Sequence, residues 1–392
     1  MKVLADALVA SSFIWSTTAF VVHNQQKPTT FVHEAISASA ALLLDETFTP
    51  PDTMGDGEIT EQACADAAAR MNRIRVPVPE SVSSTGEVGV SFVHWAAEKR
   101  TSALPIILVH GFDSSCLEYR RMGPQLAALG VDVYAVDLLG WGYSQLNDVN
   151  TFSAQAKVDA LAGFWKVIGN NKPVCVAGAS LGGAAAIEYA AANPDTVKGC
   201  VFIDAQGFVD GVGPMSMLPK FLAEAGVKVL KSVPLRNSAN QMSYYDTDTY
   251  ATDDALKIGR FHCLQEGWND ALVSFMLSGG FSPSTKVPTI ESPSLILWGR
   301  QDTILDIEFA QKFLDTLPDA ELKWIEECGH VPHLEQPKKT AEEIAAFLLS
   351  DKFVSEEILV QPMAGDEVTS KLLVAGSLGA VGVAAAALIG SL

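Results

Sequence analysis

The sequence predicts an α/β fold: a mostly parallel sheet of about eight strands, helices on both faces, and an inserted helical cap. Three observations support this prediction. Short apolar runs recur along the chain with helix-compatible segments between them, which is typical of parallel strands covered on both faces. One connection between two of these runs is far longer than the others. One run ends in the pattern G-x-S-x-G and is followed at once by a helix-compatible segment.

The main domain is expected over residues 74–350, after a linker at residues 51–73 that contains a short helix near residues 58–73. Alternating apolar side chains such as Val88, Val90 and Phe92 predict an antiparallel start. The two strands of that start are expected at residues 75–78 and 87–95, and the other strands at residues 105–110, 131–137, 174–180, 200–204, 294–299 and 324–329, with His330 just beyond the last one. Helices are expected between them at residues 117–129, 153–168 and 181–192.

The long connection covers residues 206–293. It contains two helix-compatible stretches, residues 218–230 and 256–277, and a polar patch rich in Tyr, Asp and Thr at residues 244–254. Long insertions at the carboxyl edge of a parallel sheet usually form lids or substrate pockets. We therefore expect a helical cap over that edge, and a cap that only stabilises the fold is the alternative.

Composition narrows the classes of function. The formal net charge of −19 and the pI of about 4.7 argue against nucleic acid as a partner, because phosphate binding needs clustered Lys and Arg. The same charge argues against electrostatic adsorption to anionic lipid. The six cysteines are dispersed and form no C-x-x-C pair, which predicts reduced thiols and no zinc or redox motif.

Residues 1–50 are expected to be a targeting presequence outside the folded domain. An apolar stretch at residues 5–15 follows Lys2, and Thr17 and Ala19 occupy the small-residue positions before a signal-peptidase cut. Residues 21–40 then contain Ser, Thr and Ala, with Glu34 as their single acidic residue. This two-part arrangement resembles the plastid presequences of algae with secondary plastids. A secretory signal and an N-terminal helix are the alternatives.

The C-terminal part consists of an acidic linker at residues 351–371 and a run of 21 uncharged residues, 372–392. A helix of that length spans roughly 30 Å, the hydrocarbon thickness of a bilayer. Its many Gly and Ala residues suit close helix packing in lipid. We therefore expect a transmembrane tail that anchors the protein in a membrane. A poorly ordered apolar tail is the alternative.

The G-x-S-x-G pattern places Ser180 between Gly178 and Gly182, after an apolar strand and before a helix. In that context the pattern indicates a sharp turn that exposes the serine oxygen as a nucleophile. An inert turn serine is the alternative. A serine nucleophile needs a base that accepts its proton and a carboxylate that orients the base. Along the chain, the carboxylate and then the base are expected after the serine.

Asp302 and His330 satisfy that order. Each follows an apolar strand, so both are expected at the carboxyl edge of the sheet, where Ser180 projects. Asp204, which ends the preceding strand, is the alternative carboxylate. The remaining candidates are expected to have structural roles: packing beside the site for His333, bracing a tight turn for Asp137, and a satisfied core or pocket position for His262.

Acyl transfer also needs N–H donors aimed at the developing oxyanion. The backbone N–H groups of Phe112, just after the strand at residues 105–110, and of Leu181, just after the nucleophile, are the expected donors. In the predicted chemistry, Ser180 attacks an ester carbonyl, His330 protonates the departing alcohol, and water hydrolyses the acyl-enzyme. This chemistry requires no metal or cofactor. An epoxide hydrolase or haloalkane dehalogenase on such a fold would want Asp at position 180.

Residues 88–349 resemble the α/β-hydrolases and, more narrowly, the plant chloroplast chlorophyll dephytylases. Three segments carry the narrower resemblance: LVHGFDSSCLEYRR at residues 108–121, IGRFHCL at residues 258–264 and VSFMLSGG at residues 273–280. The last two lie in the expected cap, whose sequence varies widely across this fold. The resemblance implies a catalytic triad of Ser180, Asp302 and His330. It also implies hydrolysis of the phytyl ester of chlorophyll to chlorophyllide and phytol, in a plastid at the thylakoid membrane.

A phytyl chain is long and apolar, so the cap is expected to offer it an apolar slot. The candidate lining residues, which could equally form the cap's own core, are Met215, Leu218, Phe221, Phe275 and Met276. Two alternatives within the same class are another plastid lipase or carboxylesterase and a pheophytin-specific hydrolase. A ligand-binding receptor or scaffold on the same fold is the alternative from a different class.

Overall fold

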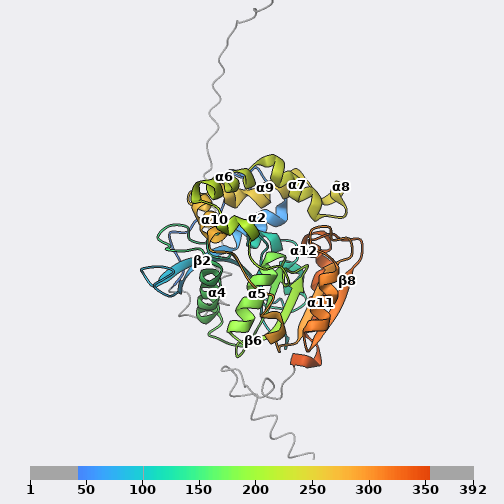
Figure 1. The fold of residues 1–392 in the computed structure, drawn as a ribbon. Coiled ribbons are helices and arrows are strands. Elements are labelled where there is room, and N and C mark those ends of the chain that lie inside the picture. Colours follow the sequence, from blue (N-terminus) through green and yellow to red (C-terminus); the bar gives the residue numbers. More distant parts are fainter. Residues whose placement is uncertain (1–42, 100, 354–392) are drawn as a thin grey trace, which may run out of the picture.

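An eight-stranded sheet forms the centre of the molecule, in the order β1-β2-β4-β3-β5-β6-β7-β8 (Figure 1). The computed structural model describes residues 43–99 and 101–353. β1 pairs with β2 and β2 with β4 in antiparallel orientation, and the remaining pairs are parallel. The strands are β1 Met71–Pro77, β2 Glu87–Trp95, β3 Ile106–Val109, β4 Val133–Val136, β5 Val174–Ala179, β6 Val197–Ile203, β7 Ser294–Gly299 and β8 Ala320–Ile325. The predicted mostly parallel sheet with an antiparallel start is confirmed.

Helices cover both faces of this sheet, so its central strands are buried on both sides. In β3, Ile107 and Val109 belong to one hydrophobic core, and Ile106 and Leu108 belong to the other. The first core contains residues of α4 Ala154–Ile168, α5 Leu181–Ala192 and α11 Glu308–Thr316; the second contains residues of α2 Gln62–Ala69, α3 Gly123–Ala128 and α13 Pro337–Leu348. Burial on both faces explains the continuous apolar runs in the sequence.

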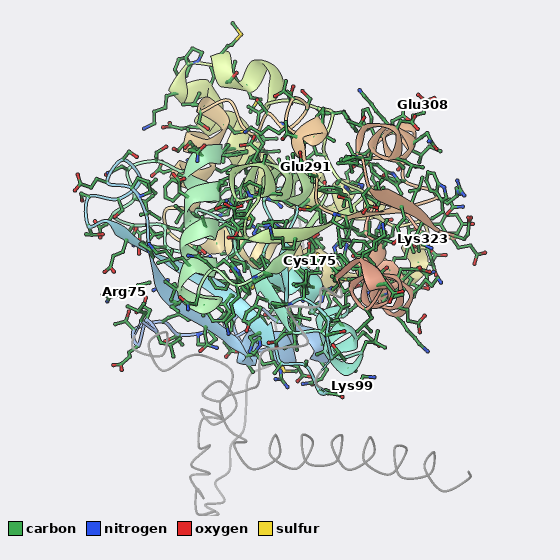
Figure 2. All side chains as sticks on the ribbon, turned by 90° about the horizontal axis from the view of Figure 1, so that it is seen from below. Arg75, Lys99, Cys175, Glu291, Glu308 and Lys323 are labelled. Carbon is green, nitrogen blue, oxygen red and sulfur yellow. The ribbon has the colours of Figure 1, made fainter. Side chains whose placement is uncertain are left out.

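The interior of the molecule is mainly apolar, although it also contains some buried charged side chains. Figure 2 shows Cys175 of β5 in the interior, whereas Arg75, Lys99 and Lys323 extend from the outside. All six cysteines of the chain are free and buried, at positions Cys64, Cys116, Cys175, Cys200, Cys263 and Cys328. These thiols therefore pack inside the protein in the same way as small apolar side chains.

A helical cap connects β6 to β7, and most of its helices form a separate layer at one end of the sheet (Figure 1). Its elements are η2 Gly213–Met217, α6 Lys220–Leu230, α7 Val233–Ser243, α8 Thr247–Tyr250, α9 Asp253–Phe261, η3 His262–Leu264, α10 Trp268–Leu277 and η4 Val287–Thr289. Helix α7 was not among the expected helices. None of its residues is buried, so its sequence lacks a clear stripe of core-facing apolar residues. The stretch expected at residues 256–277 is divided between α9 and α10, because Gly267 adopts φ +88° between them.

The segment expected as a linker packs against the domain. Ile59 is buried, and Glu61 forms an ion pair with Arg120 at 2.9 Å. The helix that follows, α2, is shorter than the predicted one because β1 already begins at Met71. Residues 1–42 of the predicted presequence, and residues 354–392, which include most of the acidic linker and the whole predicted tail, lie outside the described residues. Within residues 43–99 and 101–353, no helix has both the length and the apolar character needed to cross a bilayer.

Candidate active site

Ser180 occupies a sharp turn between β5 and α5. Its backbone has φ +51° and ψ −123°, a conformation that residues other than glycine rarely adopt. Two glycines permit this turn: a Cβ on Gly178 would lie 2.1 Å from the carbonyl oxygen of Gly182, and a Cβ on Gly182 would lie 2.2 Å from that of Val109. The strand, the turn and the helix therefore approach each other at van der Waals distance, and Ser180 stays partly exposed.

His330 and Asp302 form a hydrogen-bonded pair at the same edge of the sheet. Nδ1 of His330 lies 2.8 Å from Oδ2 of Asp302, and both side chains are buried. The other carboxylate oxygen of Asp302 accepts the backbone N–H groups of Ile304 and Leu305. Burial raises the pKa of Asp302, but the hydrogen bonds from His330 and from these N–H groups outweigh it, so the pKa is lowered overall. An ionised Asp302 therefore orients the imidazole ring.

Asp204, the alternative candidate for the orienting carboxylate, lies beside this pair. Ligating atoms of Asp204, Asp302 and His330 all lie within 4.8 Å of one another. One oxygen of Asp204 accepts the N–H of Gly299 at 2.9 Å, and no partner within the described residues is assigned to the other. Burial, followed by the charge of Asp302, raises the pKa of Asp204 well above its usual range. Because Nδ1 of His330 contacts Asp302, Asp204 lies beside the pair and does not itself orient the imidazole ring.

The other two candidates outside the cap have structural partners. Asp137 accepts the backbone N–H groups of Cys116 and Tyr143, at 2.5 and 2.8 Å, and so braces the turn after β4 as predicted. Nε2 of His333 lies 2.8 Å from a carboxylate oxygen of Glu118. His333 therefore supports a neighbouring residue, which agrees with the prediction that it packs beside the site because His330 is the histidine that directly follows the strand.

A cavity of about 320 Å³ lies between the sheet edge and the cap. Ser180, His330, Gly111 and Phe112 line it from the sheet side. Lining residues of the cap are Arg236, Ala239, Asn240, Ser243, Tyr244, Ala255, Leu256, Ile258 and Gly259. The side chains expected to act as nucleophile and base thus share one cavity, which the cap closes from the opposite side.

The two backbone N–H groups expected as oxyanion donors lie either along this cavity or next to Ser180 in the chain. Phe112 lines it, and Leu181 is the first residue of α5, where backbone N–H groups have no partner in the helix. Among the described residues, no acceptor is assigned to the N–H of either. The N-terminal end of α5 adds a partial positive charge at the same place. This arrangement suits a negative charge that develops on an oxygen near Ser180.

Glu118 supports the loop that carries Phe112, a role that the sequence did not reveal. Its carboxylate accepts the N–H of Gly111 at 3.1 Å and contacts His333 at 2.8 Å. Burial raises its pKa, but the hydrogen bond from His333 and neighbouring charges lower it to about 2. The ionised Glu118 therefore holds Gly111, and with it the adjacent N–H of Phe112. No short-range pattern marks it, because His333 lies 215 positions away.

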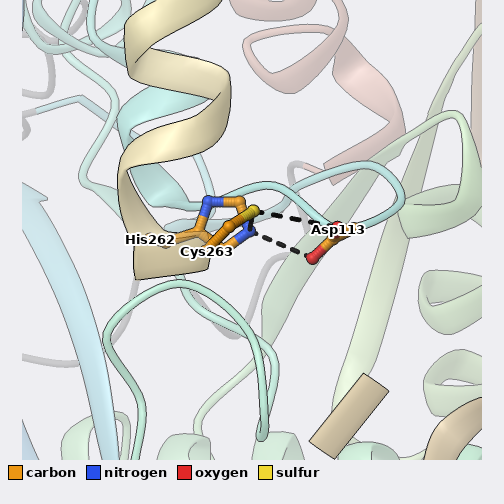
Figure 3. Close-up of side chains that lie close together, drawn as sticks. All are labelled: Asp113, His262 and Cys263. Carbon is orange, nitrogen blue, oxygen red and sulfur yellow. Dashed lines mark hydrogen bonds and ion pairs between the residues drawn. The ribbon is translucent and has the colours of Figure 1, made fainter. Parts of the chain in front are cut away.

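Asp113, the next residue along that loop, fixes the cap to the loop (Figure 3). It is buried and contacts Nε2 of His262 at 3.1 Å, Nε1 of Trp268 at 2.8 Å, and the guanidinium of Arg236. Burial raises the pKa of Asp113, but His262 and Arg236 lower it to about 2. Burial lowers the pKa of His262, but Cys263 and Asp113 raise it to about 10. His262 thus occupies a satisfied buried position, as predicted, with a charged partner that the sequence did not indicate.

Among the residues that the structure describes, two clusters have donor atoms spaced closely enough for a metal ion: Asp113 with His262 and Cys263, and Asp204 with Asp302 and His330. In the first, a nitrogen of Arg236 lies 3.2 Å from Sγ of Cys263 and also contacts Asp113, so a guanidinium already supplies the positive charge. In the second, the His330 ring nitrogen is bound to Asp302. Neither donor set is better suited to a cation than to the side-chain partners it already has.

The five residues expected to line an apolar slot lie away from this cavity, and none is among its lining residues. Phe275 and Met276 of α10 are buried in the core, while Met215 and Leu218 pack against that core. Phe221 faces outward and is 67% exposed. The structure therefore places four of them in or against the hydrophobic core that the cap shares with the main domain, because α10 packs on the main domain. This result is nearer to the alternative interpretation, a core role, than to a substrate slot.

Comparisons with known proteins agree with this architecture. Residues 106–343 match the alpha/beta hydrolase family. The alpha/beta hydrolase domain-containing protein VTE7 of Arabidopsis thaliana is 35% identical over 275 residues, covering 70% of this chain and 83% of that protein. Lipase 3 of a Moraxella species is 26% identical over 261 residues, covering 64% of this chain and 80% of that protein.

A solved structure shows the same fold at lower identity. The thermophilic esterase from Thermogutta terrifontis has a TM-score of 0.58 and 21% identity, covering 70% of this chain and 97% of that one. The family match extends over more than half of the chain, from the end of the antiparallel start to the last long helix. With the sheet order and the serine turn described above, it follows that this chain belongs to the alpha/beta hydrolase family.

Proposed function

We propose that this chain is a serine carboxylic-ester hydrolase that uses Ser180, His330 and Asp302. The observation that carries the proposal is the hydrogen-bonded His330–Asp302 pair in a cavity that Ser180 also lines. A nucleophile, a base and an orienting carboxylate on three separate loops are the groups that acyl transfer needs. The esterase and lipases among the similar proteins support the same class of reaction.

In the proposed mechanism, Oγ of Ser180 attacks the ester carbonyl while Nε2 of His330 takes its proton. The negative charge of Asp302 stabilises the imidazolium that forms. The N–H groups of Phe112 and Leu181 donate hydrogen bonds to the oxyanion of the tetrahedral intermediate. His330 then gives the proton to the departing alcohol, and a water molecule activated by His330 hydrolyses the acyl-enzyme. None of these steps calls for a metal or cofactor.

The substrate that we propose is an ester of a long apolar alcohol, with the phytyl ester of chlorophyll first. The resemblance of residues 108–121, 258–264 and 273–280 to chlorophyll dephytylases supports this choice. The cavity walls also include apolar side chains such as Leu256, Ile258 and Leu334. VTE7, a relative with 35% identity, comes from a plant, which supports a plastid location. We place the protein in a plastid at the thylakoid membrane, with a tail at residues 372–392 as one proposed anchor.

A lipase or carboxylesterase of broader specificity is the second candidate, because lipases are among the similar proteins. A pheophytin-specific hydrolase and a ligand-binding receptor are two further candidates.

To distinguish these functions, the full chain and its Ser180→Ala variant are incubated with chlorophyll, with pheophytin and with a short p-nitrophenyl ester. We expect chlorophyllide from the wild type alone. Cleavage of the short ester without cleavage of either pigment would contradict the substrate. Cleavage of pheophytin alone would identify the pheophytin-specific hydrolase, and no serine-dependent cleavage of any substrate would favour the receptor.

A further inference from the structure

Helix α6 has two apolar stripes, one on each side. Ala223 and Val227 are buried on the inner side, where α6 packs against α10. Phe221, Leu222 and Val229 face outward and are 67%, 44% and 60% exposed. With 3.6 residues per turn, positions 221, 225 and 229 align along one stripe and position 222 lies beside it. A helix on a water-facing surface normally presents polar residues there, so the outer apolar stripe suggests that this side of α6 contacts a partner.

The apolar surface continues at both ends of the helix. Met217, just before α6, is 86% exposed, and Val233, just after it, is 48% exposed. We use the term α6 face for Met217, Phe221, Leu222, Val229 and Val233. In Figure 1, α6 lies in the outer layer of the cap, on the side away from the sheet. Exposed apolar side chains gathered in this way typically mark a protein or membrane contact.

The charges beside the α6 face have the opposite sign from the chain as a whole. Lys220, Lys228 and Lys231 belong to α6 or its C-terminal cap, and Glu224 is the single acid, so three positive charges less one negative charge leave +2. Over the whole chain the net charge is −19. Because the Debye length is about 8 Å at physiological salt, a surface in contact with the face experiences mainly these local charges. The total charge therefore does not decide binding at this face.

We propose that the α6 face docks on the surface of a lipid bilayer that contains anionic lipids. The helix lies in the interface, with Phe221 and Val229 among the acyl chains and the lysines extended to the headgroups. A second copy of the chain fits less well, since a two-fold symmetric contact would place the lysines of one copy against those of the other. The proposal goes beyond ester hydrolysis and does not depend on it. Docking would bring the cap, one wall of the cavity, to the membrane in which lipophilic esters dissolve.

The experiment exploits the burial of all six native cysteines, because an introduced exposed cysteine can then be labelled selectively. The full-length Phe221→Cys variant is labelled with the fluorophore NBD and mixed with phosphatidylcholine vesicles, with or without phosphatidylglycerol. We expect a blue-shifted, stronger emission, and a larger response with phosphatidylglycerol. The matched control is Leu349→Cys, an exposed apolar position (41%) after α13, which should not respond. A response at position 221 and not at 349 reports insertion of the cap, whatever else tethers the protein.

Three outcomes would overturn the proposal. The first is an unchanged emission at position 221 in both kinds of vesicle, whether or not the protein floats with them. The second is an equal response at positions 221 and 349, which indicates nonspecific adsorption. The third is a probe at position 221 that iodide cannot quench in buffer, because another segment or a second copy would then already cover the face. The double variant Phe221→Ser/Val229→Ser checks the result independently: it should fold normally and lose the vesicle response of a label placed at Met217→Cys.

Discussion

The loops at the carboxyl edge of the sheet and the cap helices above them form opposite walls of one cavity, but different forces hold them in place. The loops follow directly from strands whose backbone hydrogen bonds fix their ends, as for Ser180 after β5. The cap is held by the packing of α10 on the main domain and by polar side-chain contacts to residues at the sheet edge. Asp113 binds Arg236 and His262, and Glu335 accepts the N–H of Asp246 at 2.7 Å.

Because of this difference, substitutions at the sheet edge and substitutions at the cap contacts should have different effects. Substitutions at the sheet edge should remove reactivity while leaving the fold intact, because the strands do not depend on the reactive side chains. Substitutions at the cap contacts should cost stability first, because buried charges lose their partners. Single substitutions on the two walls of the cavity test this separation.

Ser180→Ala should lower kcat toward a p-nitrophenyl ester about 10⁶-fold, because the acyl-enzyme cannot form. The substitution removes one oxygen atom at a partly exposed position, so the melting temperature should stay near that of the wild type. Steady-state kinetics and thermal denaturation measure the two quantities. A variant that retains most of its activity would show that Ser180 is not the nucleophile.

Asp302→Asn should lower kcat about 10⁴-fold, because the amide holds the wrong tautomer of His330 and cannot stabilise the imidazolium. The matched control is Asp204→Asn, which changes the buried carboxyl group beside the pair and should have a far smaller effect, because Asp302 and not Asp204 contacts Nδ1 of His330. Comparing kcat of the two variants assigns the acid. The reverse ranking would make Asp204 the orienting carboxylate.

Asp113→Asn should lower the free energy of unfolding by about 3–5 kcal/mol, because Arg236 and His262 lose the carboxylate that they share inside the protein. Asp210→Asn, in the connection between β6 and β7, is the control: Asp210 binds the N–H of Ser284 at an exposed site, and its loss should cost about 1 kcal/mol or less. Urea denaturation compares the variants. Similar losses for both would argue against a special role of the buried cluster.

His262 should make stability pH-dependent. Its pKa is about 10 in the folded protein and 6.5 by ordinary reference, so the folded state retains a proton that the unfolded state releases. This contribution is complete below pH 6.5 and is lost as the pH rises toward 10. The buried thiols add a similar slope at the upper end, so the test is the difference between the wild type and His262→Gln, measured by urea denaturation across this range. Parallel curves for the two proteins would contradict the prediction.

Phe221→Ser should change the free energy of unfolding by no more than about 0.5 kcal/mol, since its side chain is mostly exposed. Hydrolysis of a soluble ester should also be unchanged. Phe275→Ala, at a fully buried position of the same cap, should cost about 3–5 kcal/mol. A large loss for Phe221→Ser would show that the outer stripe of α6 supports the fold and is not free for a partner.

The sheet and the residues at its edge could be predicted because they depend on short segments. A continuous apolar run identifies a buried strand, two glycines and a serine identify the turn at Ser180, and the order of Asp302 and His330 follows from the strands before them. Their hydrogen bond agrees with that order, while their catalytic role remains a prediction. The cap and its helix α6 were predicted, but α7 was not, because α7 buries no residue and its sequence shows no clear apolar stripe.

By itself, the sequence determined the α/β fold, the place of the insertion, and the three loops that carry Ser180, Asp302 and His330. Only the tertiary structure decided which side chains support those loops and where the cap's apolar residues point. Asp113 meets His262 across 149 positions, and Glu118 meets His333 across 215. Local patterns record burial and turns, whereas contacts over such separations depend on how whole helices pack. For the same reason, Phe275 became part of the core and Phe221 part of the surface, although both are apolar residues of cap helices.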